Sequence, residues 1–411
     1  MKYLTYLLRF VVGGFFIFSG YVKAVDPMGT GFKMEEYFDV FTEYLPFLSP
    51  LWNLCAKFAL PISIGMIVFE LLIGATLILG VFRKFTLWGY ALLVGFFTVL
   101  TGFSAATNKV TDCGCFGDFL KLEPIQTFGK DVILCVLVLL LFFGAKYITP
   151  LFNKKTAMAI IAAVFGIASM AFTMRNVLDL PVSDWRPYAP GANICEGKKM
   201  EGLDPGDVRI YYTMVKTGTN ESKEVTDKEY LEKRLYEDKT WEIDKSKTRK
   251  EVIRKPEQPK IKDFVIRTAD DHDITDAMLA RSGYQFIVSS YNFAQSDREG
   301  FKKIAALMRE AQQDNVPAIG VSNMSPAEVE AVGEGVYKYY MLDATPIKTM
   351  MRSNPGVMLI KDCVVIDKWH CNHLPAWQQI KAQYNISKQA PPQPLEEAPA
   401  EAAATDSTAV H

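Results

Sequence analysis

Residues 58–81 read FALPISIGMIVFELLIGATLILGV, a run in which Glu70 is the single ionisable side chain. About 20 apolar residues in a helix are enough to cross the roughly 30 Å of hydrocarbon in a bilayer. The run reaches that length without a charged face that could point to water. It therefore predicts a membrane-spanning helix.

Four more apolar stretches reach or approach the same length: Tyr3–Val22, Leu87–Ala106, Val132–Lys146 and Ala157–Met174. Any single stretch could be a buried core helix, but five in succession favour a multi-pass protein whose first partner is the lipid bilayer. The first stretch follows Lys2, as in a cleaved signal peptide. It contains Arg9 and lacks a good small-residue cleavage site before Val25, so a retained anchor fits better.

The 411-residue chain divides into two unlike halves. It is mostly apolar up to about Arg175 and strongly charged from about Asp179, although the whole chain has a formal net charge of −1. No basic stripe with interleaved aromatic residues is present, so nothing in the sequence indicates nucleic-acid binding. The composition predicts a membrane bundle joined to a soluble domain.

The basic residues of the short loops predict the orientation of the bundle, because cytoplasmic loops carry an excess of Lys and Arg. One set of loops and ends is basic, with Lys2, Arg83, Lys84, Lys146, Lys154 and Lys155. The opposite loops mix Lys with acidic residues. We therefore expect a bacterial inner (cytoplasmic) membrane protein whose N-terminus is cytoplasmic, with the soluble half and the loop around Cys113 in the periplasm.

Two ionisable residues lie inside predicted spans, Arg9 in the first and Glu70 in the second. Such residues are expensive in hydrocarbon and need a partner or a wet cavity. One interpretation is a structural ion pair between the two helices; the other is a proton or small-molecule site. Small residues in both spans would allow the close packing that buries such a pair. They are Gly13, Gly14 and Gly20 in the first and Gly65, Gly74 and Gly80 in the second.

The sharpest local motif is the stretch TDCGCFGD at 111–118, with Cys113 and Cys115 one residue apart. A disulfide between them would close a very small, strained ring, and strained disulfides suit thiol exchange better than stapling. The alternatives are free thiols, or separate bridges to Cys55 or Cys195. The spacing without clustered His is not typical of zinc. Lys130 and Asp131, at the start of the next span, could tune the pKa of such a pair.

Three segments resemble the DoxX/MauE-like membrane proteins over roughly residues 1–150. They are Arg9–Lys23 followed by Asp26-Pro27, the Glu70-to-Arg83 pattern, and Cys113–Gly117 followed by Thr127–Asp131. The resemblance implies a four-helix core, here with a fifth helix at 151–180. The MauE (methylamine utilisation) branch is associated with disulfide formation during methylamine dehydrogenase maturation. The core is also similar to thiol–quinone oxidoreductases, which makes a quinone the candidate cofactor.

In the soluble half we expect an exoplasmic juxtamembrane α+β segment at 181–260, an α/β domain at 261–388 and a disordered tail at 389–411. The first segment should hold a strand at Val208–Lys216. The α/β domain is predicted from strands at Phe264–Arg267, Tyr284–Tyr291 and Pro317–Val321, an amphipathic helix at Asp297–Gln313, helices at Pro326–Val332 and Ile347–Arg352, and a hairpin of Val357–Ile360 and Val364–Trp369. This order resembles the thioredoxin fold.

Two features of this domain bear on its role. Asn354-Pro355-Gly356 stands where thioredoxin-like proteins place a cis-proline, so Pro355 is a candidate cis residue. The usual Cys-x-x-Cys is missing, because Asn292–Asp297 contains no cysteine. Cys363 and Cys371 should be too far apart to pair along a strand, and we read His370, Cys371 and His373 as unrelated residues rather than metal ligands.

These features favour a membrane component of an exoplasmic thiol-redox, electron-relay or disulfide-maturation system, with Cys113 and Cys115 as the redox pair. The soluble domain would bind an exported protein substrate. The rival hypothesis is a non-enzymatic scaffold or assembly factor for envelope proteins, in which the cysteines are structural. A transporter is a third, resting only on Glu70.

Overall fold

The computed structural model describes residues 1–110, 117–120, 122–152, 154–219, 221–254, 256–329 and 335–395. The chain forms two compact units. One consists of Met1–Ala192 together with Val265–His411, and the other of Asn193–Phe264. Cys113 and Cys115 lie outside the described residues.

Among the described residues, five helices are long and apolar enough to span a membrane. They are α1 (Lys2–Val25), α4 (Ala59–Leu79), α5 (Arg83–Thr107), α6 (Pro124–Phe143) and α7 (Lys155–Leu178). Large apolar side chains such as Trp88, Leu92 and Val99 are about 70% exposed on their outer faces. This exposure suits side chains that face lipid rather than water. The prediction of a multi-pass helical membrane protein is therefore confirmed.

Small residues set the distance between α1 and α4. A Cβ atom added to Gly74 would lie 2.8 Å from Ile17 Cγ1 and 3.0 Å from the carbonyl oxygen of Gly13. A Cβ atom on Gly13 would lie 2.6 Å from Ile78 Cγ1. The two helices therefore touch through their backbones, as small-residue packing in membranes allows. Gly65 in the same helix has no neighbour within 4 Å of the equivalent position.

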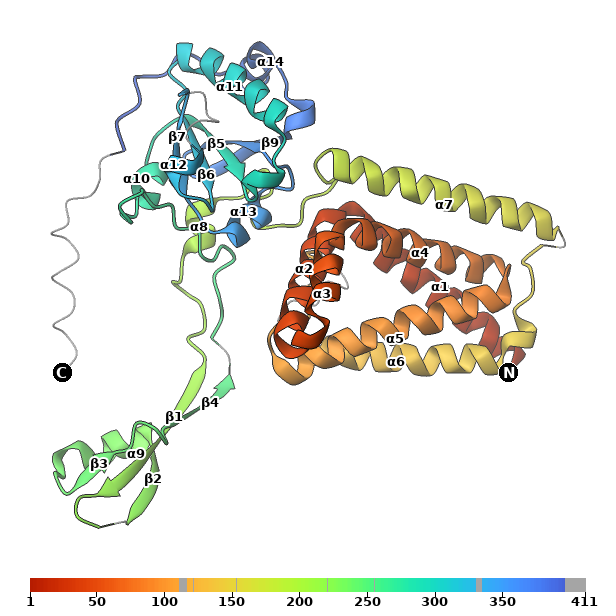
Figure 1. Ribbon diagram of the computed structural model, residues 1–411, viewed down its shortest axis with the longest axis horizontal. Helices are drawn as coiled ribbons and strands as arrows, with labels where there is room; N and C mark the ends of the chain where they lie inside the picture. Colours follow the sequence, from red (N-terminus) through yellow and green to blue (C-terminus); the bar gives the residue numbers. More distant parts are fainter. Residues whose placement is uncertain are drawn as a thin grey trace. The chain divides into compact units, whose positions relative to one another are not determined.

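The connection between α1 and α4 is helical, which the sequence did not lead us to expect. It consists of α2 (Pro27–Tyr44), the short η1 (Pro46–Leu48) and α3 (Ser49–Lys57). Figure 1 shows α2 and α3 lying across one end of the bundle, crosswise to α4 and α5. Apolar residues of α2, including Tyr37 and Phe38, form a buried cluster with Ala59, Leu100 and Val110 at the ends of the neighbouring helices.

The sheet of the first unit has the strand order β7-β6-β5-β8-β9. β5, β6 and β7 are parallel neighbours, whereas β8 is antiparallel to both β5 and β9. The strands are β5 (Tyr284–Ser290), β6 (Ala318–Ser322), β7 (Lys338–Met341), β8 (Gly356–Lys361) and β9 (Val364–His370), and the helices are α10 (Thr275–Leu279), α11 (Arg298–Gln313), α12 (Pro326–Val329), α13 (Ala344–Met350) and α14 (Trp377–Gln383). A βαβ unit followed by a β-hairpin is the thioredoxin-like arrangement that the sequence predicts.

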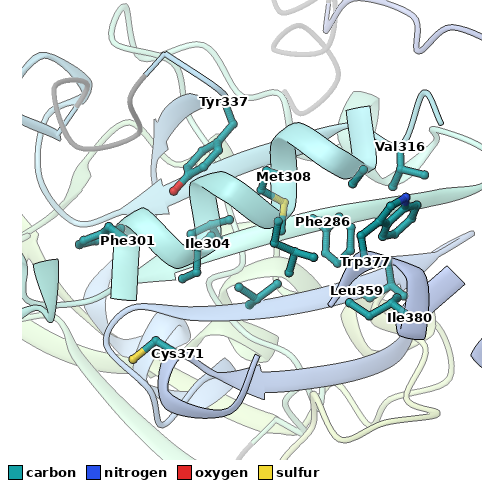
Figure 2. Close-up of a cluster of buried hydrophobic side chains, with 14 of the residues drawn as sticks. Phe286, Phe301, Ile304, Met308, Val316, Tyr337, Leu359, Cys371, Trp377 and Ile380 are labelled. Carbon is teal, nitrogen blue, oxygen red and sulfur yellow. The ribbon is translucent and has the colours of Figure 1, made fainter. Parts of the chain in front are cut away.

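The core of this domain lies between α11 and the sheet. Figure 2 shows Phe301, Ile304 and Met308 along α11, and these side chains belong to one buried cluster with Phe286 and Leu359 of the central strands. These side chains are almost fully buried, and the positions on α11 follow the helical repeat read from the sequence. Burial of large apolar side chains contributes about 1.5–3 kcal/mol each, which makes this layer the main source of the domain's stability.

One predicted strand is wrong, and one strand of the structure was not predicted. Phe264–Arg267 forms no named strand, and Arg267 makes only isolated bridges to Asp273 and Met341. β7 was not predicted, although it forms the edge of the sheet next to β6. Both errors arise because a short buried segment has the same apolar pattern in a strand and in irregular structure.

The second unit contains a small antiparallel sheet in which β1 (Asp207–Lys216) pairs with β2 (Ser222–Thr226), β3 (Trp241–Ile243) and β4 (Arg249–Arg254). It also contains α8 (Ile194–Lys198) and α9 (Asp227–Glu232). Cations lie over aromatic rings on its surface, with Lys223 Nζ 4.0 Å from the Trp241 ring centre and Arg249 Cζ 3.9 Å from that of Tyr211. The predicted strand Val208–Lys216 corresponds to β1.

The backbone contact between α1 and α4 generates a stability prediction. Gly74→Ala should push α1 away from α4 and lower the free energy of unfolding by about 1–3 kcal/mol, since overpacking a tight contact costs this much. The measurement is the thermal unfolding midpoint of the purified protein in detergent. Gly65→Ala, in the same helix but in open space, is the matched control and should leave the midpoint unchanged. Equal midpoints for both variants would contradict the packing account.

Candidate functional site

The site begins at the junction of α1 and α2. Asp26 follows the last residue of α1 and caps the N-terminus of α2, where its Oδ1 accepts a hydrogen bond of 2.9 Å from the Gly29 amide. Pro27 occupies the first helical position, which suits its fixed φ and missing N–H. The Asp-Pro pair therefore both starts α2 and fixes one carboxylate at the end of the bundle.

Arg352 of the thioredoxin-like domain binds this carboxylate. Its Nε donates to Asp26 Oδ1 and Oδ2 at 2.9 and 3.0 Å, and its Nη2 donates to Oδ2 at 2.7 Å. The side chains of Arg352 and Asp26 are only 5% and 14% exposed. Two-pronged contacts between guanidinium and carboxylate are strong and directional. The pair therefore fixes the thioredoxin-like domain against the α1–α2 junction.

The same guanidinium reaches the segment that follows the cysteine motif. Arg352 Nη2 lies 3.4 Å from Asp118 Oδ2, and Asp118 is 26% exposed. Cys113 and Cys115 themselves lie outside the described residues. Asp118 is thus the described residue through which the Cys-Gly-Cys segment is connected to the soluble domain.

A second buried ion cluster joins the segment after α7 to the same domain. Arg186 Nε donates to Asp184 Oδ1 at 2.7 Å, and Arg186 Nη1 donates to the Thr349 carbonyl at 3.1 Å. Lys368 of β9 also pairs with Asp184. Arg186 and Lys368 share the one carboxylate of Asp184, and Asp26 also acts on Arg186, so each buried cation has an opposite charge nearby.

The electrostatics of both clusters shift several pKa values. Burial alone would raise the pKa of Asp26, but Arg352 outweighs it and holds the pKa at about 2. Burial lowers the pKa of Lys368 to about 8, and the nearby Arg186 acts in the same direction. Burial would also raise the pKa of Asp184, yet Arg186 and Lys368 keep it below its usual value. The carboxylates are therefore ionised at neutral pH.

Asp26, Arg186 and Arg352 from these clusters line a cavity of about 440 Å³. Its walls come from the end of α1, α2, the residues Gly117 and Asp118, the segment around Trp185, and α13. Both signs of charge face it, including Lys33, Glu36 and Lys348. This volume is within the range of small-molecule sites, about 300–1,000 Å³, and the end of the cysteine motif forms part of its wall.

The sequence suggested an ion pair between Glu70 and Arg9, and this is wrong. The partner of Glu70 is Lys23 of α1. Lys23 Nζ lies 2.9 and 2.7 Å from the two Glu70 oxygens and donates to Ser19 Oγ at 3.0 Å. Both charged side chains are under 5% exposed. A smaller cavity of about 40 Å³ lies beside this pair, and Lys23 lines it as well as the larger one.

Arg9 instead binds backbone oxygens at the end of α4. Its Nε donates to the Leu77 carbonyl and its Nη1 to that of Thr149, each at 2.8 Å. The last carbonyls of a helix have no partner within it and carry partial negative charge. Gly80 caps α4 with φ 71°, and a Cβ atom added to it would collide with the Thr149 carbonyl oxygen, which leaves no room for a side chain. Arg9 therefore connects α1 to the end of α4 and to the segment before α7.

Lys130 and Asp131 contact each other and a neighbouring helix. Lys130 Nζ lies 2.6 Å from Asp131 Oδ1, and Thr101 of α5 donates to Asp131 Oδ2 at 2.9 Å. Asp131 is 2% exposed. We expected these two residues to tune the pKa values of Cys113 and Cys115. Both cysteines lie outside the described residues, so this stays a prediction.

The thioredoxin-like domain carries a third polar group near the start of α11. The Asn354–Pro355 peptide bond is cis. Close by, the Cys371 thiol is buried, with Ser353 donating to its sulfur at 3.5 Å and Asp297 Oδ2 3.9 Å away. Figure 2 shows Cys371 at the edge of the apolar cluster. Burial, with the Asp297 carboxylate, raises the pKa of Cys371, so this thiol is a weak nucleophile at neutral pH.

The state of the other cysteines limits which of them could form a disulfide with Cys113 or Cys115. Cys55, Cys135 and Cys371 are free among the described cysteines, so the structure forms no staple through Cys55. Cys195 and Cys363 are disulfide-bonded, which we did not predict for Cys363. His370 accepts a hydrogen bond from the Asn372 amide, and His373 lies 3.5 Å from Asp179.

Sequence reasoning missed Asp26, Asp118, Lys23 and Arg352. One signal was available: Arg352 stands alone in the otherwise uncharged stretch Met350–Gly356. A single Arg in an apolar setting needs a buried partner, but the sequence does not say which one.

Comparisons with known proteins give a family match for the N-terminal part of the chain. Residues 1–144 match the family described as methylamine utilisation protein MauE. Protein TlpB of Flavobacterium psychrophilum is 26% identical over 190 residues, which are 44% of this chain and 48% of the relative. The chain therefore spans about half the length of this curated relative.

One solved structure is also similar to part of the chain. It is the solution structure of a candidate protein disulfide isomerase from Bacteroides thetaiotaomicron, with a TM-score of 0.24 and 16% identity. The match covers 31% of this chain and 87% of that chain.

The Asp26–Arg352 pair predicts a pH-dependent stability. Asp26→Asn should lower the free energy of unfolding by roughly 3–5 kcal/mol at pH 7, because it leaves the buried guanidinium without its main counter-charge. The folded pKa of about 2 lies below the unfolded value of about 3.9. The ionised Asp26 carboxylate therefore makes its full contribution to the free energy of unfolding above about pH 4. About 2 kcal/mol of this contribution is lost as the pH falls toward 2.

The measurement is the unfolding midpoint of both proteins in detergent between pH 7 and pH 2.5. The gap between the native protein and Asp26→Asn should be constant above about pH 4.5 and shrink below it. A gap that stays the same over the whole range would show that Asp26 does not titrate with the depressed pKa.

Proposed function

We propose that this chain is the membrane component of an exoplasmic thiol-redox system. Cys113 and Cys115 form the exchanging pair, and the thioredoxin-like domain receives an exported protein substrate. The match of residues 1–144 to the MauE family supports the first part. The thioredoxin-like topology of the sheet domain supports the second.

The observation that carries this proposal is the contact of Arg352 with Asp118. Cys115 lies three residues before Asp118, so its Cα atom is at most about 11 Å from that of Asp118. Arg352 is itself two residues from the cis bond at Pro355. The residue just after the cysteine motif therefore contacts a residue that is two positions from the cis bond of the thioredoxin-like domain.

The soluble domain binds rather than exchanges. Its segment Asn292–Asp297 contains no cysteine, and the nearby Cys371 is buried with a raised pKa. Thiol exchange requires an accessible thiolate. The dithiol of the system is therefore Cys113 and Cys115 in the membrane part, and exchange with a substrate dithiol moves two electrons and two protons between the two pairs.

The compartment is the periplasmic side of a bacterial inner membrane. Basic residues lie at the starts of α1, α5 and α7 and after the end of α6, and the excess of Lys and Arg in cytoplasmic loops supports a cytoplasmic position for these ends. The disulfide bonding of Cys195 and Cys363 supports an oxidising compartment for the soluble part. The N-terminus is then cytoplasmic.

A non-enzymatic scaffold is the second candidate. The observation that favours it is the density of buried ion pairs around Arg352 and Asp184, which hold the domain in place whatever the state of the cysteines. In that case the cysteines serve structure alone, and no disulfide passes to a substrate.

A single-turnover experiment separates the two functions. The oxidised protein in nanodiscs is mixed with excess reduced ribonuclease A under argon, and the disulfides gained by the ribonuclease are counted by mass spectrometry. The native protein should transfer about one disulfide per chain, and Cys113→Ser/Cys115→Ser should transfer none. Cys135→Ser, which removes a free thiol of α6, is the matched control and should behave as the native protein. Equal transfer by native protein and double variant would refute the redox proposal.

The Asp118 contact makes a separate prediction. Asp118→Asn keeps the Asp26–Arg352 pair but weakens the tether of the cysteine motif, so the rate of transfer should fall by about tenfold as positioning is lost. The control is Glu43→Gln, which removes the exposed ion pair with Lys109 and should change the rate less than about twofold. If both variants react at the native rate, the Asp118–Arg352 contact has no part in the reaction.

A further inference from the structure

The short helix α3 has an apolar face that no described part of the chain covers. Leu51 is 47% exposed, Leu54 54% and Phe58, its capping residue, 48%. Phe47, in the preceding η1, is 76% exposed. At about 100° per residue, Leu51, Leu54 and Phe58 fall within an arc of about 60°. They therefore form one continuous stripe.

The rest of the α3 surface is divided in two. Trp52, Cys55 and Ala56 pack against the buried cluster of α2. Asn53 and Lys57 are exposed and lie on the arc between the packed side and the apolar stripe. A helix with a packed side, a polar exposed side and an apolar exposed side is suited to a boundary between water and an apolar phase.

The place of α3 in the fold identifies that apolar phase. α3 ends at Lys57, and the membrane-spanning helix α4 begins at Ala59, so one end of α3 is fixed at the surface of the bilayer. Figure 1 shows α3 across the end of the bundle and crosswise to α4. The stripe therefore starts next to the first residue of a membrane-spanning helix, in a bundle whose helix α5 exposes Trp88, Leu92 and Val99.

We propose that α3 is an interfacial helix, embedded in the head-group region with Leu51, Leu54 and Phe58 among the acyl chains. Lys57, on the polar arc, lines a cavity together with Asn292 and Phe293 of the thioredoxin-like domain, so this side of α3 faces the soluble domain rather than the lipid. Val110, the last described residue before the cysteine motif, is fully buried in the same cluster that holds Trp52 and Cys55. The depth of α3 in the membrane therefore also fixes the depth of Val110, the described residue that precedes the cysteine motif.

Depth-dependent quenching tests the proposal and needs no thiol chemistry. Leu54→Trp places a reporter on the apolar stripe and Asn53→Trp places one on the polar arc of the same helix. Each is reconstituted in vesicles of phosphatidylcholine with or without bromine atoms on the acyl chain near the head group. Subtracting the signal of the parent protein isolates the added Trp. The Leu54 reporter should be quenched at least about twofold more than the Asn53 reporter.

Three results would overturn the proposal. The first is equal quenching at the two positions, and the second is no quenching at position 54. The third is cross-linking of Leu54→Cys between two chains in nanodiscs that hold several copies, without quenching of the Leu54 reporter. That result would make a second copy the partner of the stripe. Amide hydrogen exchange of residues 49–57, measured in the native protein and in each variant, checks that α3 is folded in every preparation.

Discussion

The buried guanidinium of Arg352 is the contact on which the arrangement of this chain depends. It binds Asp26, which starts α2 at the end of the bundle, and reaches Asp118, which follows the cysteine motif. One side chain thereby connects the membrane part, the motif and the thioredoxin-like domain. A buried cation without partners would cost several kcal/mol, so the three parts are held together by the requirement that this charge stay paired.

Much of the fold could be read from the sequence, and the failures have physical causes. The membrane helices could be predicted from the length and hydropathy of their sequences. The buried face of α11 could be predicted from the helical spacing of its apolar residues. α2 and α3 escaped notice because they mix charged, aromatic and small residues and lie at an interface, where neither a purely apolar nor a clean amphipathic pattern is required. Phe264 and Ile266 are buried in irregular backbone, which their apolar character does not distinguish from a strand.

The site was harder to predict than the fold, because its contacts are long-range. Arg352 and Asp26 are 326 residues apart, and charge patterns over such distances carry no local signal. Lys23 stands one residue beyond the predicted span Tyr3–Val22, so Arg9 was the only charged residue of that span to consider as a partner of Glu70. In the antiparallel pair α1 and α4, Lys23 lies beside Glu70 while Arg9 lies beside the end of α4. The chemistry of Cys113 and Cys115 could be proposed from sequence because the unusual spacing is itself the signal.

The central claim is that Cys113 and Cys115 form a labile disulfide on the outer face of the membrane. The most direct measurement labels thiols of the native protein in intact membranes with an impermeant reagent, before and after mild reduction, and maps the labelled cysteines by mass spectrometry. The account predicts that both cysteines are labelled only after mild reduction and lose this reactivity again when an oxidised thiol partner is added. Labelling of both without reduction, or protection that survives mild reduction through bridges to other cysteines, would contradict it.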